Sequence, residues 1–148
     1  MMENLPVILN KLYSLLGELE ATLVEEIGQL SRAQINPVSL QVISDNKSRL
    51  LSAINFYDEQ RKQEEKHHRL AFPYPRHSEL ATLWDRITVV VRKSAELNQK
   101  SYQLLNMHMK KMNDFKKIVS QTTATAQLYG ESGNRSNDAS GNVYRISV

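Results

Sequence analysis

The chain has 148 residues, of which 41% are hydrophobic and 24% are charged, and this balance predicts one globular domain with one core rather than two domains or a disordered chain. It contains no cysteine, which excludes disulfides, thiolate metal sites and thiol nucleophiles and favours a cytoplasmic location. Its apolar runs are far shorter than the roughly 20 residues that span a bilayer. Its first residues do not resemble a signal peptide.

The net charge of +3 is divided unevenly along the chain. Residues 1–60 carry 4 basic and 8 acidic side chains, whereas residues 78–128 carry 8 basic and 4 acidic ones. Opposite charges on neighbouring helices favour their packing against each other, and so small a total argues against nucleic-acid binding.

Residues 4–32 show apolar side chains in steps of three and four, which predicts an amphipathic helix. The stripe consists of Leu5, Leu9, Leu12, Leu16, Leu19, Leu23, Ile27 and Leu30, widened by Ile8, Leu15 and Val24. Gly17 and Gly28 interrupt this helix at a cost of about 1 kcal/mol each relative to alanine. We expect close helix contacts at both glycines to offset that cost.

A second helix is predicted over residues 37–70, because Asn36 is a favoured N-cap residue and Pro37 fits the first helical position. Its stripe reads Leu40, Ile43, Lys47, Leu50, Ile54, Tyr57 and Arg61, with Leu51 alongside. We expect Lys47 to pair with an acidic side chain of the first helix rather than to act as a catalytic lysine. The following Phe72-Pro73-Tyr74-Pro75 predicts an extended, polyproline-like connection.

A third, much longer helix is predicted over residues 78–128, starting at Ser78 and Glu79 and ending near Gly130. Its stripe comprises Leu80, Leu83, Ile87, Val90, Ser94, Leu97, Ser101, Leu104, His108, Lys111, Phe115, Ile118 and Thr122. His108 is expected to be packed or hydrogen-bonded there. Residues 131–148 are polar and predict a disordered tail.

The third helix is too long for its neighbours. At about 1.5 Å per residue the three helices would reach about 43, 50 and 76 Å. In an up-down-up arrangement the second helix leaves the third without a partner beyond about Lys111. We therefore expect a bundle over residues 1–111, a protruding helix end over residues 112–130 and a tail over residues 131–148.

The last turns of this helix keep their apolar side chains, which monomeric soluble proteins seldom leave exposed without a use. We name as the binding stripe Leu104, Leu105, Met107, Met109, Met112, Phe115, Ile118 and Val119. Methionine adapts to irregular apolar partners, and the flanking Lys110, Lys111, Lys116 and Lys117 favour an acidic one. Two alternatives stay open: the stripe folds back onto the bundle, or it closes a weak homodimer.

Catalytic motifs are missing from the sequence. It has no GxSxG, P-loop or GxGxxG motif, so we expect no enzyme and no cofactor. The only group that resembles metal ligands is His67, His68 and His77 with Glu64 and Glu65. Adjacent histidines point about 100° apart on a helix, so a metal-dependent enzyme is the least favoured interpretation.

Several short pieces of the chain, in this order and spacing, resemble the flagellar export chaperones of the FlgN family. They are Gln34-Ile35-Asn36, Leu40, Ile43, Lys47, Leu50-Leu51, Gln60-Arg61, Trp84, Ile87, Leu97-Asn98, Leu104-Leu105, Leu128-Tyr129-Gly130 and the final Ile146-Ser147-Val148. Of these pieces, the Leu-Tyr-Gly sequence after a long third helix is the most specific to the family. Ser101 departs from the pattern, because the family often has a second asparagine there.

The resemblance implies a small all-helical cytoplasmic chaperone. It implies binding to the C-terminal helical regions of the hook-filament junction proteins FlgK and FlgL through the chaperone's own C-terminal helix, here the binding stripe. It also implies delivery of these clients to the type III export apparatus, with Leu128, Tyr129 and Gly130 docking on the export gate protein FlhA. We therefore predict an all-α fold, an antiparallel three-helix bundle with an extended C-terminal helix. The alternative is a structural homo-oligomeric coiled coil without a client.

Overall fold

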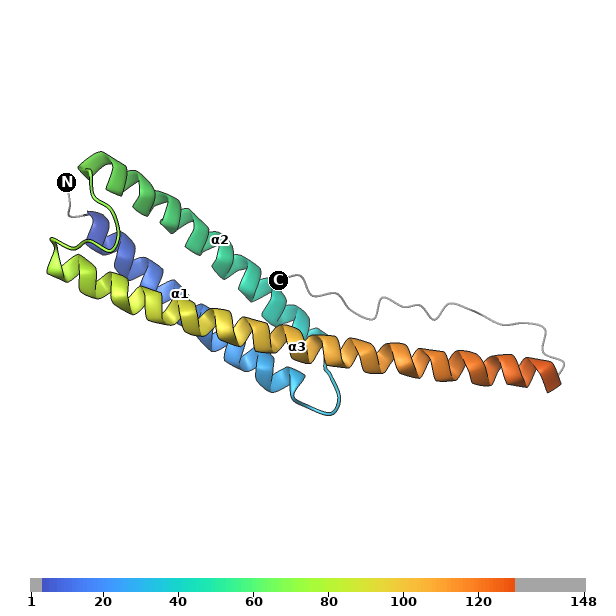
Figure 1. Ribbon diagram of the computed structural model, residues 1–148. Coiled ribbons are helices and arrows are strands. Elements are labelled where there is room, and N and C mark those ends of the chain that lie inside the picture. Colours follow the sequence, from blue (N-terminus) through green and yellow to red (C-terminus); the bar gives the residue numbers. More distant parts are fainter. Residues whose placement is uncertain (1–3, 130–148) are drawn as a thin grey trace.

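Over the residues that the structure describes, the protein folds into three α-helices in an antiparallel bundle, as the sequence predicts. The computed structural model describes residues 4–129 and, of these, the side chains of residues 4–124. The helices are α1 (Asn4–Leu30), α2 (Pro37–His68) and α3 (Ser78–Tyr129), and α2 runs opposite to the other two (Figure 1). Each observed boundary lies within two residues of the predicted one. The predicted disordered tail lies outside the described residues.

Helix α1 is the centre of the bundle, since it packs against both α2 and α3. Its buried apolar side chains run from the first turn to the last and form most of the main core. Those that belong to the main core are Leu5, Ile8, Leu9, Leu12, Leu15, Leu16, Leu19 and Leu23, and Leu30 in the last turn is buried in a separate small core. The period of the sequence therefore predicted the buried face correctly, although Val24, expected at its edge, is exposed.

The expectation for the two glycines of α1 is wrong. Both Gly17 and Gly28 are exposed, and a Cβ built at either would have no neighbouring atom within 4 Å. No close helix contact offsets their conformational cost, which the long buried face of α1 must absorb.

A buried ion pair joins α1 to α2, which confirms the predicted pairing of Lys47. Its Nζ lies 3.0 Å from Oε1 and 3.3 Å from Oε2 of Glu26, and both side chains are 2% exposed. From α3, Ser101 donates its hydroxyl proton to Glu26, and Asn98 accepts a hydrogen bond from Lys47 at 3.4 Å. This network ties all three helices together towards the end of the bundle where α1 connects to α2.

A second polar cluster closes the opposite end, where the chain passes from α2 to α3. Arg61 donates to Asp58 at 2.8 Å and to Glu65 at 2.7 Å, and the hydroxyl of the buried Tyr74 donates to Glu65. Burial alone would lower the pKa of Arg61, but its two carboxylate partners hold that pKa above the usual value. Burial, reinforced by the hydrogen bond to Glu65, raises the pKa of Tyr74.

Aromatic rings cover this cluster. The guanidinium of Arg61 lies 4.9 Å from the ring centroid of Trp84 and 5.5 Å from that of Phe72, and the two rings stack at 5.1 Å. The expected extended backbone is wrong at Tyr74, whose φ of 61° lies in the left-handed region. The buried side chain of Tyr74 holds the residue there, because its ring packs in the core and its hydroxyl has a charged partner.

Candidate functional site

Helix α3 extends far beyond the rest of the bundle (Figure 1). Its last buried side chain in the described region is Leu105, and every side chain from residue 109 to residue 124 is exposed. Its 52 residues would span about 78 Å, against about 40 Å for the 27 residues of α1. The predicted difference in reach is therefore present.

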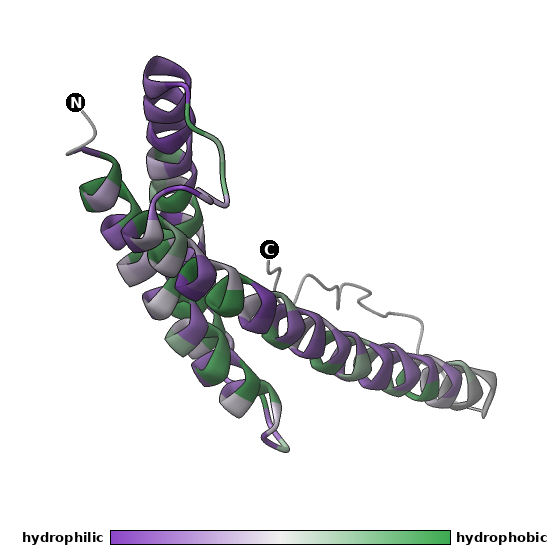
Figure 2. Cartoon of the chain, turned by 60° about the vertical axis from the view of Figure 1, so that its left-hand side comes forward, coloured by the Kyte–Doolittle hydropathy of each residue, from purple (hydrophilic) through white to green (hydrophobic). Residues whose placement is uncertain are grey.

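Hydrophobic residues alternate with hydrophilic ones along the protruding end of α3 (Figure 2). Six members of the binding stripe are exposed, and Phe115 (67%) and Ile118 (59%) are the most accessible. The others are Met107, Met109, Met112 and Val119. Among the described residues, nothing in this chain folds back over them, which removes the first alternative for this surface.

Leu104 and Leu105 do not share this exposure, which corrects the expectation for these two members of the stripe. Leu105 is 8% exposed and forms a small second core with Leu30 and Leu40, against which Leu104 and Ile35 pack. This core fixes α3 to the α1–α2 connection. The exposed part of the stripe therefore begins at Met107, about one helical turn after the predicted start at Leu104.

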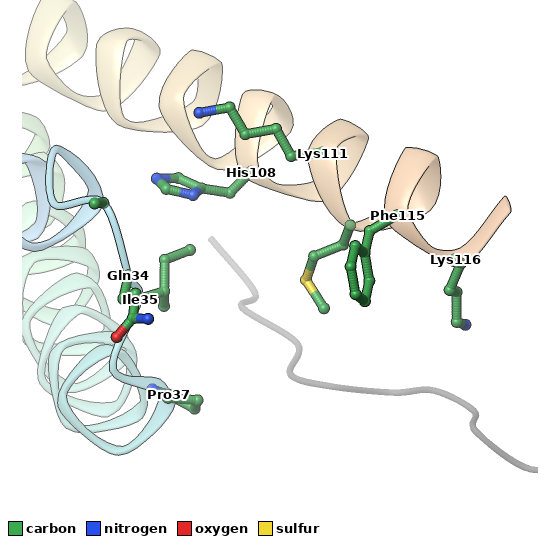
Figure 3. Close-up of a pocket in the computed structure, with 9 residues that line it drawn as sticks. Gln34, Ile35, Pro37, His108, Lys111, Phe115 and Lys116 are labelled. Carbon is green, nitrogen blue, oxygen red and sulfur yellow. The ribbon is translucent and has the colours of Figure 1, made fainter. Parts of the chain in front are cut away.

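A groove of about 630 Å³ lies between the α1–α2 loop and the first exposed turns of α3. Figure 3 shows the loop residues Gln34 and Ile35, and Pro37 at the start of α2, facing His108 and Phe115 across it. Most of the groove surface is apolar. We call this feature the loop groove; its remaining lining residues are Ala33, Lys111, Met112 and Lys116.

Local interactions fix both walls of the loop groove. The Oδ1 atom of Asn36 accepts hydrogen bonds from the backbone N–H groups of Val38 (3.1 Å) and Ser39 (3.3 Å), which confirms the predicted N-cap. On the other wall, Nε2 of His108 lies 2.6 Å from the carbonyl oxygen of Leu30. That carbonyl is one of the last in α1 and lacks a partner within its helix. His108 is therefore hydrogen-bonded, as the sequence predicts.

The surface around the groove is basic. Residues 105–124 include Lys110, Lys111, Lys116 and Lys117 but only one acidic residue, Asp114. Lys111 and Lys116 line the groove itself. A negatively charged partner would meet favourable charges along this part of α3.

The sequence did not predict the groove. In the sequence, Ile35 stands out only as part of the Gln34-Ile35-Asn36 piece of the family resemblance. No periodic pattern places a loop beside a particular turn of a distant helix. An apolar residue between two helices, followed directly by an N-cap, was the available signal.

The histidine-rich end of α2 was the other candidate site. Nε2 of His68 lies 3.2 Å from Oε2 of Glu64, and the rings of His67 and His68 meet edge to face at 4.9 Å. In the part of the chain that the structure describes, no three His, Asp or Glu side chains are placed to hold a metal ion. Over the same residues, none of the helices combines the length and hydrophobicity of a membrane span.

Comparison with known proteins identifies the family to which this sequence belongs. The FlgN protein family matches residues 1–137. The chain belongs to the FlgN family. It is 29% identical over 135 residues to the flagella synthesis protein FlgN of Salmonella typhimurium, covering 91% of this chain and 92% of the relative. No solved structure matches the chain with comparable significance.

Two further FlgN relatives agree with this assignment. The flagella synthesis protein FlgN of Escherichia coli is 26% identical over 136 residues, which cover 91% of this chain and 92% of the relative. That of Yersinia enterocolitica is 28% identical over 131 residues, 88% of each chain. FlgN membership confirms the resemblance seen in the sequence and gives the chain a role in flagellar assembly.

Proposed function

We propose that the chain is a cytoplasmic export chaperone that binds the C-terminal helical regions of the hook-filament junction proteins FlgK and FlgL. The observation that carries this proposal is the apolar end of α3, which the bundle leaves uncovered in a member of a flagellar assembly family. An amphipathic client helix laid on this surface covers apolar area on both partners. The client is then prevented from associating prematurely.

Client binding uses the exposed members of the binding stripe. Phe115 and Ile118 are separated by three positions and therefore lie on one face of α3, with Met112 and Val119 beside them. Leu104 and Leu105 act indirectly in this proposal, because their packing on Leu30 and Leu40 sets the direction in which the protruding helix leaves the bundle.

Delivery to the export gate is assigned to the end of α3. Leu128, Tyr129 and Gly130 would dock on FlhA. The side chains of Leu128 and Tyr129 and the whole of Gly130 lie outside the described residues, so this assignment rests on the family resemblance. The expected result for Tyr129→Ala is unchanged client binding with weakened gate docking. Equal loss of both activities would refute the division.

The experiment that tests the proposal measures binding of the purified chain to the C-terminal segments of FlgK and FlgL from the same organism. Phe115→Asp with Ile118→Asp should abolish binding, because two carboxylates would be buried against an apolar client surface. Val42→Asp with Val89→Asp is the matched control, since both valines are 63% exposed but lie on the bundle. The control should bind as the unchanged chain does.

The second candidate is a homo-oligomeric coiled coil without a client, in which α3 ends cover each other. Size measurement with and without a client segment separates the two. A stable dimer that hides Phe115 and Ile118 and excludes both client segments would favour the structural role.

A further inference from the structure

The loop groove differs from the rest of the α3 surface because it has a second wall. Beyond Lys116, a partner of α3 would contact one helix alone. Between His108 and Lys116 the same partner would also meet the α1–α2 loop at Ala33 to Ile35 and the first residue of α2, Pro37. The rim of the groove is open to solvent, and Phe115, which forms part of it, remains 67% exposed.

The loop groove has an apolar floor, and a lysine lies on each side of it. Ile35, Met112 and Phe115 provide apolar surface from both walls. Lys111 and Lys116 are five positions apart and therefore project about 140° from each other around α3, with Met112 and Phe115 between them. A helix lying along this floor would meet a lysine at each of its two edges.

We infer that the loop groove holds one apolar anchor of the client helix and that acidic residues of this helix, on both sides of its apolar face, pair with Lys111 and Lys116. This inference rests on the proposed function and specifies which residues of the chain recognise the client helix. Charge complementarity selects the occupant. Residues 105–124 contain four lysines and one aspartate, so this surface attracts an acidic helix. The same α3 end of a second copy is repelled.

Charge reversal tests the lysine pair with a control on the same helix. Lys111→Glu with Lys116→Glu should weaken binding of the FlgK and FlgL segments at least about tenfold. Lys110→Glu with Lys117→Glu changes the net charge equally, but these lysines project about 140° and 160° away from Phe115. The control pair should retain affinity within about threefold. Reversing the acidic residues of the segment to lysine should restore binding to the first variant.

An added charge tests the loop wall without removing any core contact. Ala33 is exposed and lines the groove, so Ala33→Glu should repel the acidic edge of the client and weaken binding about fivefold or more. Ser52→Glu adds the same charge at an exposed position of α2 outside the groove and should have no effect. Unchanged thermal unfolding of all variants would show that the fold is intact.

The outcomes separate this inference from the proposed function. If neither segment binds the unchanged chain or the chain without residues 130–148, the proposed function fails and the groove assignment fails with it. If the segments bind but each test variant has the same affinity as its control variant, the proposed function stands and the groove assignment is wrong. It is also wrong if Lys111→Glu with Lys116→Glu dissociates a dimer of the chain. If the FlgK and FlgL segments bind only after residues 130–148 have been removed, residues 130–148 of the chain itself, and not the client, would be the occupant of the groove.

Discussion

Lys47 of α2 and Glu26 of α1 form an ion pair of 3.0 Å with both side chains 2% exposed. Removing one partner leaves a buried charge, so Lys47→Met should lower the free energy of unfolding by about 3–5 kcal/mol. Replacing both with apolar residues, in Glu26→Leu with Lys47→Met, should recover most of this loss. Urea unfolding measures both values. Lys93→Met, which breaks an exposed pair with Glu20, should cost less than about 1 kcal/mol.

Alkaline pH should destabilise the protein through Tyr74. Burial and the bond to Glu65 raise its pKa in the folded state, so the folded chain keeps a proton that the unfolded chain loses above about pH 10. The contribution to stability is therefore complete below that pH and declines as the pH rises towards the folded-state pKa. Tyr74→Phe should reduce the slope of stability against pH above about pH 10.

The same substitution should cost about 1–3 kcal/mol at pH 7, because Glu65 loses a buried hydrogen bond. Tyr102→Phe is the control, since it removes a phenol that is 55% exposed. Urea unfolding at pH 7 and pH 10.5 compares the variants. Equal slopes for Tyr74→Phe and the unchanged chain would contradict the assignment.

Replacing either of the two glycines of α1 with alanine should stabilise the protein. A Cβ at Gly17 or Gly28 meets no atom within 4 Å, so Gly17→Ala and Gly28→Ala should each raise the free energy of unfolding by up to about 1 kcal/mol. The two effects should add, because the sites are far apart on the helix. A loss of stability or of client binding in either variant would mean that this exposed face of α1 has a partner.

The border between bundle and protruding helix should appear as a contrast between two alanine substitutions on α3. Leu105→Ala removes a buried side chain of the second core and should cost about 2–5 kcal/mol. Phe115→Ala removes an exposed side chain and should change stability by no more than about 0.5 kcal/mol. Thermal unfolding followed by circular dichroism measures both. A large effect of Phe115→Ala would place that residue in the core.

Local sequence chemistry determined the helices and their relative lengths. Neighbouring positions in the sequence determine the N-cap at Asn36, the glycine- and proline-poor segments and the apolar period of three and four residues. The length of each helix then follows from its number of residues and the rise per residue. The excess length of α3 and its apolar, lysine-flanked end therefore followed from the sequence alone. So did the pairing of Lys47, since a lone cation on an apolar face needs a buried acid.

Packing between the helices sets which of their surfaces meet. A periodic pattern identifies the apolar face of a helix but not its neighbour, so it could not show that Leu105 is buried on Leu30 and Leu40 or that Gly17 lies free of contacts. The left-handed Tyr74 depends on a buried partner from another segment, Glu65. The loop groove exists because Ile35 and Phe115, distant in sequence, are brought together by the angle at which α3 leaves the bundle, and side-chain packing sets that angle.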